Sequence, residues 1–146
     1  MNLNKIREMW AKDSSIDQTE LDAESLKIPN LHCKYLDIYT VKKMQLEKEQ
    51  SELRKARRLR YLYYRGYMDE QELADLDWEP WNLALSKNTE ITQVIEGDFY
   101  IEPLIQKVAY MRAQVEYLES ILKMVSTRSF QIRDAIAFTK FKNGLE

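Results

Sequence analysis

The sequence has little of the material that catalytic and metal sites require. Its 146 residues include one histidine (His32), one cysteine (Cys33), three glycines and three prolines. His32 and Cys33 face different directions on a helix and supply too few ligands for a usual metal site, so we expect both to pack in the core. A lone cysteine excludes an intrachain disulfide, and three widely separated glycines cannot form a phosphate-binding loop. We therefore expect no enzymatic activity, no metal and no cofactor.

Long apolar runs and an excess of one charge are also missing. No segment approaches the roughly 20 apolar residues of a membrane span, and residues 1–8 lack the apolar core of a signal peptide. The formal net charge is -2, so any binding of nucleic acid must come from a local patch rather than the overall field. This composition fits a protein of the reducing cytoplasm that makes no contact with membranes.

The residues that are present favour long helices. Charged residues make up 32% of the chain, mostly glutamate, lysine and arginine, which is typical of solvent-facing helices. Apolar spacing, caps and breakers predict a short helix over residues 2–12, a second one capped by Asp17, a long helix from Pro29 to Arg65 ending at Gly66, a turn or two over 70–76, and a helix capped by Asn88 that Gly97 closes.

A heptad pattern follows Asp98, where apolar residues alternate spacings of three and four. Its wide stripe favours a bundle of several helices, and an apolar final helix is expected over 127–142. The seam either packs on the long helix of the same chain or associates with other copies, and the sequence leaves both open. The residues assigned to self-association are Leu104, Val108, Met111, Val115, Leu118, Leu122, Phe130, Ile132, Ile136 and Phe138.

The most distinctive stretch is basic and aromatic. Six cations and no acid fall between Arg54 and Arg65, with tyrosines among them. Cations neutralise phosphates and aromatic faces stack on unpaired bases, so this combination indicates a surface for single-stranded nucleic acid. The candidate DNA-binding residues are Arg54, Lys55, Arg57, Arg58, Arg60, Tyr61, Tyr64 and Arg65.

Other interpretations of this run remain open. It also fits a solvated helix face that pairs with Glu47, Glu49 and Glu52 or with the acidic block 69–79, and Tyr63 and Tyr64 also fit core positions. The protein would then be a structural coiled-coil adaptor without nucleic-acid binding. A duplex-binding regulator is the third alternative, but it needs a helix suited to the major groove, and the sequence identifies none. The acidic block receives no assigned role.

Three motifs, in this order and spacing, resemble the UvsY family, the recombination mediator proteins of T4-like bacteriophages. They are Ile16-Asp17 with Thr19, Leu21 and Glu24 before His32-Cys33-Lys34-Tyr35-Leu36; the basic run leading into Tyr63-Tyr64-Arg65-Gly66; and Ser126-Thr127-Arg128-Ser129-Phe130-Gln131-Ile132-Arg133 followed by Ile136, Phe138 and Lys142-Asn143-Gly144.

The resemblance implies an all-α protein without enzymatic activity that assembles into a homo-oligomeric ring of six or seven subunits. It implies that the protein binds single-stranded DNA and contacts a RecA-like phage recombinase and the phage single-strand-binding protein. By these contacts it would promote loading of the recombinase onto coated strands, in the cytoplasm of the infected bacterial host. In the family, the C-terminal region supports oligomerisation.

The resemblance also singles out two basic positions. In the family, a lysine and an arginine two positions apart, just before the tyrosine pair, support DNA binding. Anchored on the tyrosines, they correspond to Arg58 and Arg60, which we favour; anchored on a Lys-Ala-Arg triplet, they correspond to Lys55 and Arg57.

Together, these observations predict one all-helical domain over residues 1–146. It is a long-helix hairpin or bundle with a C-terminal apolar helix. Its segments are the N-terminal helices with the basic run (1–66), an acidic connector (67–97), and the heptad helix with the oligomerisation helix (98–146).

Overall fold

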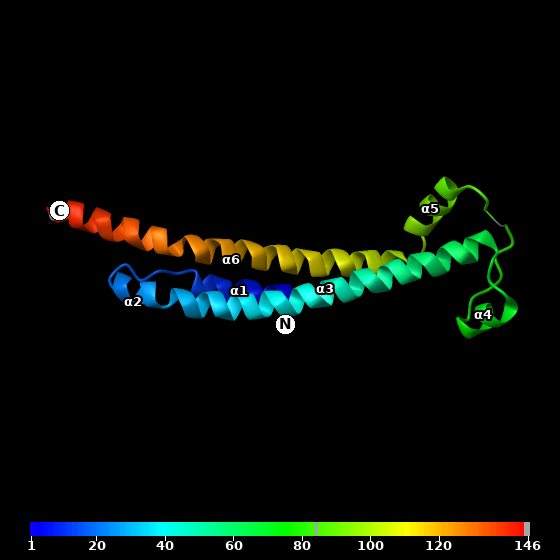
Figure 1. Ribbon diagram of the computed structural model, residues 1–146, viewed down its shortest axis with the longest axis horizontal. Coiled ribbons are helices and arrows are strands. Elements are labelled where there is room, and N and C mark those ends of the chain that lie inside the picture. Colours follow the sequence, from blue (N-terminus) through cyan, green and yellow to red (C-terminus); the bar gives the residue numbers. More distant parts are fainter. Residues whose placement is uncertain (84, 145–146) are drawn as a thin grey trace. The chain divides into compact units, whose positions relative to one another are not determined.

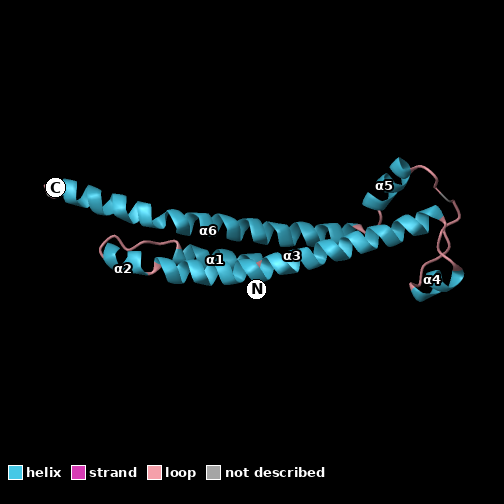
Figure 2. Ribbon diagram, viewed as in Figure 1, coloured by secondary structure: helices cyan, strands magenta, loops and turns pink. Residues whose placement is uncertain are grey.

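The computed structural model describes residues 1–83 and 85–144, which contain only helices, turns and loops (Figures 1 and 2). No strand occurs in this part of the chain, so the all-α prediction is confirmed. No helix in it is long and apolar enough to cross a membrane. The helices are α1 (Leu3–Asp13), α2 (Leu21–Leu26), α3 (Ile28–Arg65), α4 (Glu70–Asp75), α5 (Asn88–Glu96) and α6 (Glu102–Lys142).

The chain forms two compact units. Unit 1 comprises Met1–Met44 and Arg112–Glu146, and unit 2 comprises Gln45–Met111. Each unit takes one part of α3 and one part of α6, so the boundaries fall within helices. The unit boundaries do not coincide with the predicted segment boundaries at 66/67 and 97/98. Those predicted boundaries lie just after the ends of α3 and α5. Folding as a single domain stays a prediction.

The core of unit 1 joins three helices. Ile6 of α1, Tyr35 of α3, and Leu118, Ile121 and Val125 of α6 form one buried cluster. Burying apolar side chains of this size is the main favourable term in folding. Figure 1 shows α1 beside α3 and α6. The heptad residues of α6 in this unit therefore pack on the long helix of their own chain.

A buried arginine fastens the connection between α1 and α2 to α6. Arg128 donates hydrogen bonds to the backbone carbonyls of Asp13 (2.9 Å) and Ser15 (2.8 Å), and its Nη2 lies 3.3 Å from Glu24 Oε2. The guanidinium satisfies two carbonyls that have no helical partner at the end of α1. Arg128 thus fastens the end of α1 and the start of the following connection to α6.

Two predicted caps have other roles. Asp17 does not cap α2, which begins at Leu21; its carboxylate instead accepts hydrogen bonds from the backbone and hydroxyl of Thr19. Asn88 is the first residue of α5 rather than its cap, and its side chain accepts a hydrogen bond from Tyr61. Local hydrogen bonds of this kind compete with capping for short polar side chains.

The separate C-terminal helix expected from Thr127 is also wrong. α6 runs unbroken from Glu102 to Lys142, because Ser126 and Thr127 bond back to carbonyls of the preceding turn without interrupting the helix. His32 and Cys33 are exposed on α3, so their expected core packing is wrong as well. Tyr35, rather than His32 or Cys33, lies on the inward face of α3 in this part of the helix.

In unit 2, α3 ends as predicted. Gly66 has φ +74°, a backbone conformation that glycine adopts without the steric cost of a side chain. The backbone N–H of Gly66 bonds to the Tyr63 carbonyl (3.1 Å), which closes the helix. The chain then enters α4, where Asp69 and Glu72 form a reciprocal capping box. Part of the acidic block therefore has a local structural role.

Candidate nucleic-acid interface

An exposed cation face lies on α3 within unit 2. We define it as Arg54, Lys55 and Arg58, three exposed side chains that share one side of the helix. Lys55 lies 3.4 Å from Glu52 Oε1. Among residues 1–83 and 85–144, no ion pair or side-chain hydrogen bond engages Arg54 or Arg58. These two guanidiniums lie four residues apart, so they project from one face and are available to external phosphates.

The two arginines and the tyrosine beside the cation face contact the segment around α5. Arg57, Tyr61 and Arg65 are half-buried at the edge of the cation face. Their contacts are Arg57 Nε to Glu96 Oε1 (3.1 Å), the Tyr61 hydroxyl to Asn88 Oδ1 (3.1 Å) and Arg65 Nη1 to the Ser86 carbonyl (2.6 Å). These contacts hold α5 along one border of the cation face.

Arg60 lies in the interior and is only 3% exposed. Its Nη2 and Nε lie 2.6 Å and 2.8 Å from the same oxygen of Asp98, Oδ2. The Tyr64 hydroxyl donates to that oxygen as well and accepts a hydrogen bond from Arg60 Nη2 (3.1 Å). Burial raises the pKa of the Tyr64 hydroxyl, and its bond to the Asp98 carboxylate raises it further. The three side chains form a closed, paired network.

Aromatic rings surround the same guanidinium. Flat, weakly hydrated guanidinium groups are attracted to ring faces, and burial strengthens that attraction. The distances from Arg60 Cζ to the ring centroids are 4.4 Å for Tyr63, 5.1 Å for Tyr64, 4.7 Å for Trp78, 5.5 Å for Phe99 and 5.7 Å for Tyr100. Arg60 and Tyr64, both predicted to contact DNA, are therefore not placed to meet a phosphate or a base.

Sequence reasoning placed Arg60 on the cationic side and did not identify Asp98. The signal for Arg60 is the apolar stripe of α3: Leu53 and Ala56 are buried, and Arg60 continues their spacing of three and four. The signal for Asp98 is its place between Gly97, which closes α5, and the start of the heptad seam. An acid there is typical of a helix start. The charge of Arg60 concealed its position on the packing face.

The acidic block does not neutralise the basic run. Within the described residues, no salt bridge joins 69–79 to any cation between Arg54 and Arg65. Of the predicted partners, Glu52 pairs with Lys55 of the run, whereas Glu49 pairs with Lys107 of α6 (3.1 Å). Arg54 and Arg58 keep their full charge toward solvent.

The residues predicted to mediate self-association fall into two groups. Most of the seam is used within the chain: Val108, Val115, Leu118 and Ile132 are buried, and Leu104, Met111, Leu122 and Ile136 are half-buried. Phe130 and Phe138 are different, because they are 55% and 66% exposed on α6. Within the predicted set, these two offer the large exposed apolar side chains, and Phe141 of the same helix is 79% exposed as well.

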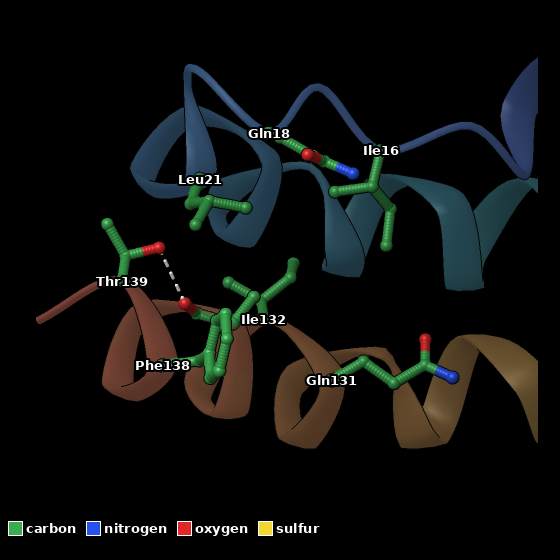
Figure 3. A pocket seen from close by; sticks show the side chains of 8 residues that line it. Ile16, Gln18, Leu21, Gln131, Ile132, Phe138 and Thr139 are labelled. Carbon is green, nitrogen blue, oxygen red and sulfur yellow. Dashed lines mark hydrogen bonds between the residues drawn. The ribbon is translucent and has the colours of Figure 1, made fainter. Parts of the chain in front are cut away.

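A groove of about 470 Å³ lies beside one of these phenylalanines in unit 1. Figure 3 shows Ile16 and Leu21, from the segment around α2, facing Ile132 and Phe138 of α6. The groove is mostly apolar and open to solvent. It provides apolar surface next to the exposed end of α6.

Comparisons with known proteins bear on this arrangement. Residues 9–145 match the family described as "Recombination, repair and ssDNA binding protein UvsY". A comparison with curated proteins finds no match. Three crystal structures of the bacteriophage T4 recombination mediator protein UvsY, in lattice types II, IV and I, share the fold, with TM-scores of 0.84, 0.79 and 0.80.

These structures are 21%, 21% and 20% identical in sequence; the matches cover 98%, 97% and 94% of this chain, and 98%, 99% and 98% of theirs. The family match covers nearly the whole chain, and it confirms the resemblance inferred from the three motifs. The chain therefore belongs to the UvsY family of recombination, repair and single-stranded-DNA-binding proteins.

Proposed function

We propose that the cation face of α3 is the surface through which this protein binds single-stranded DNA, with Arg57 and Arg65 assisting at its edge. The observation that carries the proposal is the pair Arg54 and Arg58, exposed and without acidic partners in the described chain. Arg60 and Tyr64 are left out of the contact set because both are buried. The half-buried ring of Tyr61 lies close enough to the face to stack on a base.

Through this surface, the protein promotes loading of a RecA-like phage recombinase onto strands coated by the phage single-strand-binding protein. Its cations hold the strand in a geometry that favours the recombinase over the competing coat. Such a shift needs only differential affinity for two states of the strand, and no covalent step. The process belongs to the cytoplasm of the infected bacterial host, where the protein contacts both of those partners.

The protein acts as a homo-oligomeric ring of six or seven subunits. Exposed Phe130 and Phe138 and the groove beside α6 support the C-terminal part of α6 as the interface, since the rest of the seam is occupied within the chain. One cation face offers about three phosphate contacts, which predicts a salt slope near -2 and weak binding. Several faces on one ring bind a single strand far more tightly through effective concentration.

The test is fluorescence anisotropy with a labelled single strand at several salt concentrations. We expect the Arg54→Ala/Arg58→Ala variant to lose affinity and to reduce the log–log salt slope by about 1.4 for each subunit that contacts the strand, which is two single-strand contacts per subunit. The matched control is Arg7→Ala/Arg112→Ala, which removes the same charge from exposed positions in unit 1. Equal losses in both variants would contradict a localised site. A preference for duplex competitor would favour the duplex-binding alternative.

A second measurement addresses mediation. Assembly of the recombinase on single strands coated with the single-strand-binding protein is followed with and without this protein. Wild type should shorten the delay before assembly, and the Arg54→Ala/Arg58→Ala variant should not. If the variant mediates as well as wild type, the cation face is not the surface that acts on the strand.

A further inference from the structure

We propose that Arg60 and Asp98 form a positioning pair that holds the DNA-binding turns of α3 in register with α5, and that Arg60 makes no contact with DNA. The inference rests on the proposed function, because the cation face is the surface being positioned. It assigns a role to Arg60, the most buried cation of the basic run, and to Asp98, an acid outside that run.

Asp98 is built into the backbone where α5 gives way to α6. Its carbonyl accepts hydrogen bonds from the N–H groups of Ile101 (3.1 Å) and Glu102 (2.9 Å), which start α6. Its Oδ1 accepts a bond from the Tyr100 N–H (2.7 Å), while Oδ2 receives Arg60. Both carboxylate oxygens are thus engaged, and the side chain is fully buried. The pair therefore joins α3 to the junction between α5 and α6.

This junction determines where α5 lies along α3. Glu96, two residues before Asp98, contacts Arg57, and the start of α5 contacts Tyr61. These outer contacts are exposed, and exposed ion pairs contribute little to rigidity. The buried Arg60–Asp98 pair is the inner anchor of the same interface. Without it, α5 keeps its buried side chains Ile91 and Ile95 but loses its buried ion-pair anchor to α3, so the border of the cation face is held less precisely.

Arg60 is also poorly suited to leave its site for a phosphate. Moving it outward would separate it from five aromatic rings and leave the Asp98 carboxylate buried without its cation. An uncompensated buried charge is among the most destabilising changes in a protein. One phosphate contact in a solvated, salt-screened groove does not offset that loss. Arg60 therefore acts on DNA binding through α5 and the cation face.

The two roles predict opposite effects for Asp98→Asn. If Arg60 contacts DNA, neutralising its acidic partner frees the guanidinium and removes a repulsive charge, so affinity rises. If Arg60 is a positioning residue, the same change loosens the interface and affinity falls. The substitution preserves the size of the side chain. The sign of the change in Kd therefore distinguishes the two roles.

The experiment measures Kd and salt slope for wild type, Asp98→Asn, Arg58→Ala and the matched control Glu90→Gln. If the binding-competent arrangement falls to about a tenth of molecules, Kd for Asp98→Asn rises about tenfold. Its salt slope should equal that of wild type, whereas Arg58→Ala should reduce the slope by about 0.7 for each subunit that contacts the strand. Glu90→Gln removes an exposed acid of α5 that has no ion pair among the described residues, and it should leave affinity unchanged or higher. Circular dichroism confirms that each variant is folded.

A measurement on the wild-type protein keeps the inference testable if Asp98→Asn does not fold. Arginines are modified with phenylglyoxal, with and without a single-stranded oligonucleotide, and located by mass spectrometry. Arg54 and Arg58 should react in the free protein and be protected by DNA, whereas Arg60 should be inert in both conditions.

Two results would overturn the positioning role. One is an Arg60 that reacts in the free protein and is protected by DNA; the other is a folded Asp98→Asn that binds as tightly as wild type or more tightly. Failure of DNA to protect Arg54 and Arg58 would instead refute the cation face itself. The two failures are therefore distinguishable.

Discussion

Replacing Leu118 by alanine tests whether the heptad seam of α6 belongs to the core of one chain or to the contact between chains. Leu118 is fully buried in unit 1, in one cluster with Ile6, Tyr35 and Val125. Its neighbours come from three helices, so the site cannot collapse by the movement of one of them. An assignment to self-association would instead place Leu118 at a subunit boundary.

The expected loss follows from that burial. Truncating a fully buried leucine removes the transfer free energy of its methyl groups and leaves a cavity, and such changes cost about 2–5 kcal/mol. Because α3 and α6 are long, continuous helices that cannot easily move into the cavity, we expect the upper half of that range. Leu26, 80% exposed, offers the same substitution without burial, and Leu26→Ala should change stability by no more than about 0.5 kcal/mol.

The assay is urea unfolding followed by circular dichroism, at protein concentrations about tenfold apart. If Leu118 is a core residue, Leu118→Ala lowers the midpoint by the same amount at both concentrations, and the oligomer size by light scattering is unchanged. Phe138→Ala should behave in the opposite way, with little change in subunit stability but a smaller oligomer. A Leu118→Ala variant that keeps wild-type stability as a dissociated subunit would refute the core assignment.

Two further predictions concern a helix end and a titrating group. Gly66→Ala should lower the free energy of unfolding by about 1 kcal/mol because φ is positive there. Gly97→Ala should be neutral, because φ is -95° and an added Cβ would make an ordinary van der Waals contact, 3.9 Å from the Gln93 carbonyl oxygen. Equal effects of the two substitutions in urea unfolding would refute this. Burial raises the pKa of Asp13, but hydrogen bonds from Lys34 and Tyr35 outweigh it, so its pKa lies below the ordinary 3.8. The stability that comes from the lowered pKa is present above the ordinary value of 3.8 and is lost as the pH falls through the lowered pKa. On acidification, the melting temperature of Asp13→Asn should therefore fall less steeply than that of wild type.

The course of the long helix could be predicted from sequence because strong local signals agree. No glycine lies between Pro29 and Gly66, and proline is compatible with the first turn of a helix. The observed α3 starts one residue earlier and ends at Arg65, as expected. The helix start expected near Thr127 is wrong, because Ser126 and Thr127 lie within α6. Within α6 they bond to the preceding turn, and only tertiary packing decides between these alternatives.

The candidate site could be predicted only in part, since charge and position give conflicting signals. Arg54 and Arg58 are exposed as expected, but Arg60 lies on the stripe that Leu53 and Ala56 define. An arginine on that stripe can be buried only if a carboxylate is available in the folded chain. Asp98 supplies it from 38 residues away along the sequence, beyond the reach of any local pattern. The tertiary fold, not the local sequence, determines the partner of a buried charge.

The division of the basic run into buried and exposed cations explains how a protein of net charge -2 can carry a site for a polyanion. The acidic block is on the same chain, but it caps α4 and leaves Arg54 and Arg58 unpaired. At physiological salt, charges further away than about 8 Å are largely screened, so the local face determines what a strand encounters. Arg60 contributes no charge to that face, yet its burial holds α5 at the border of the face. Affinity for DNA therefore depends on an interior ion pair as well as on the cations that meet the phosphates.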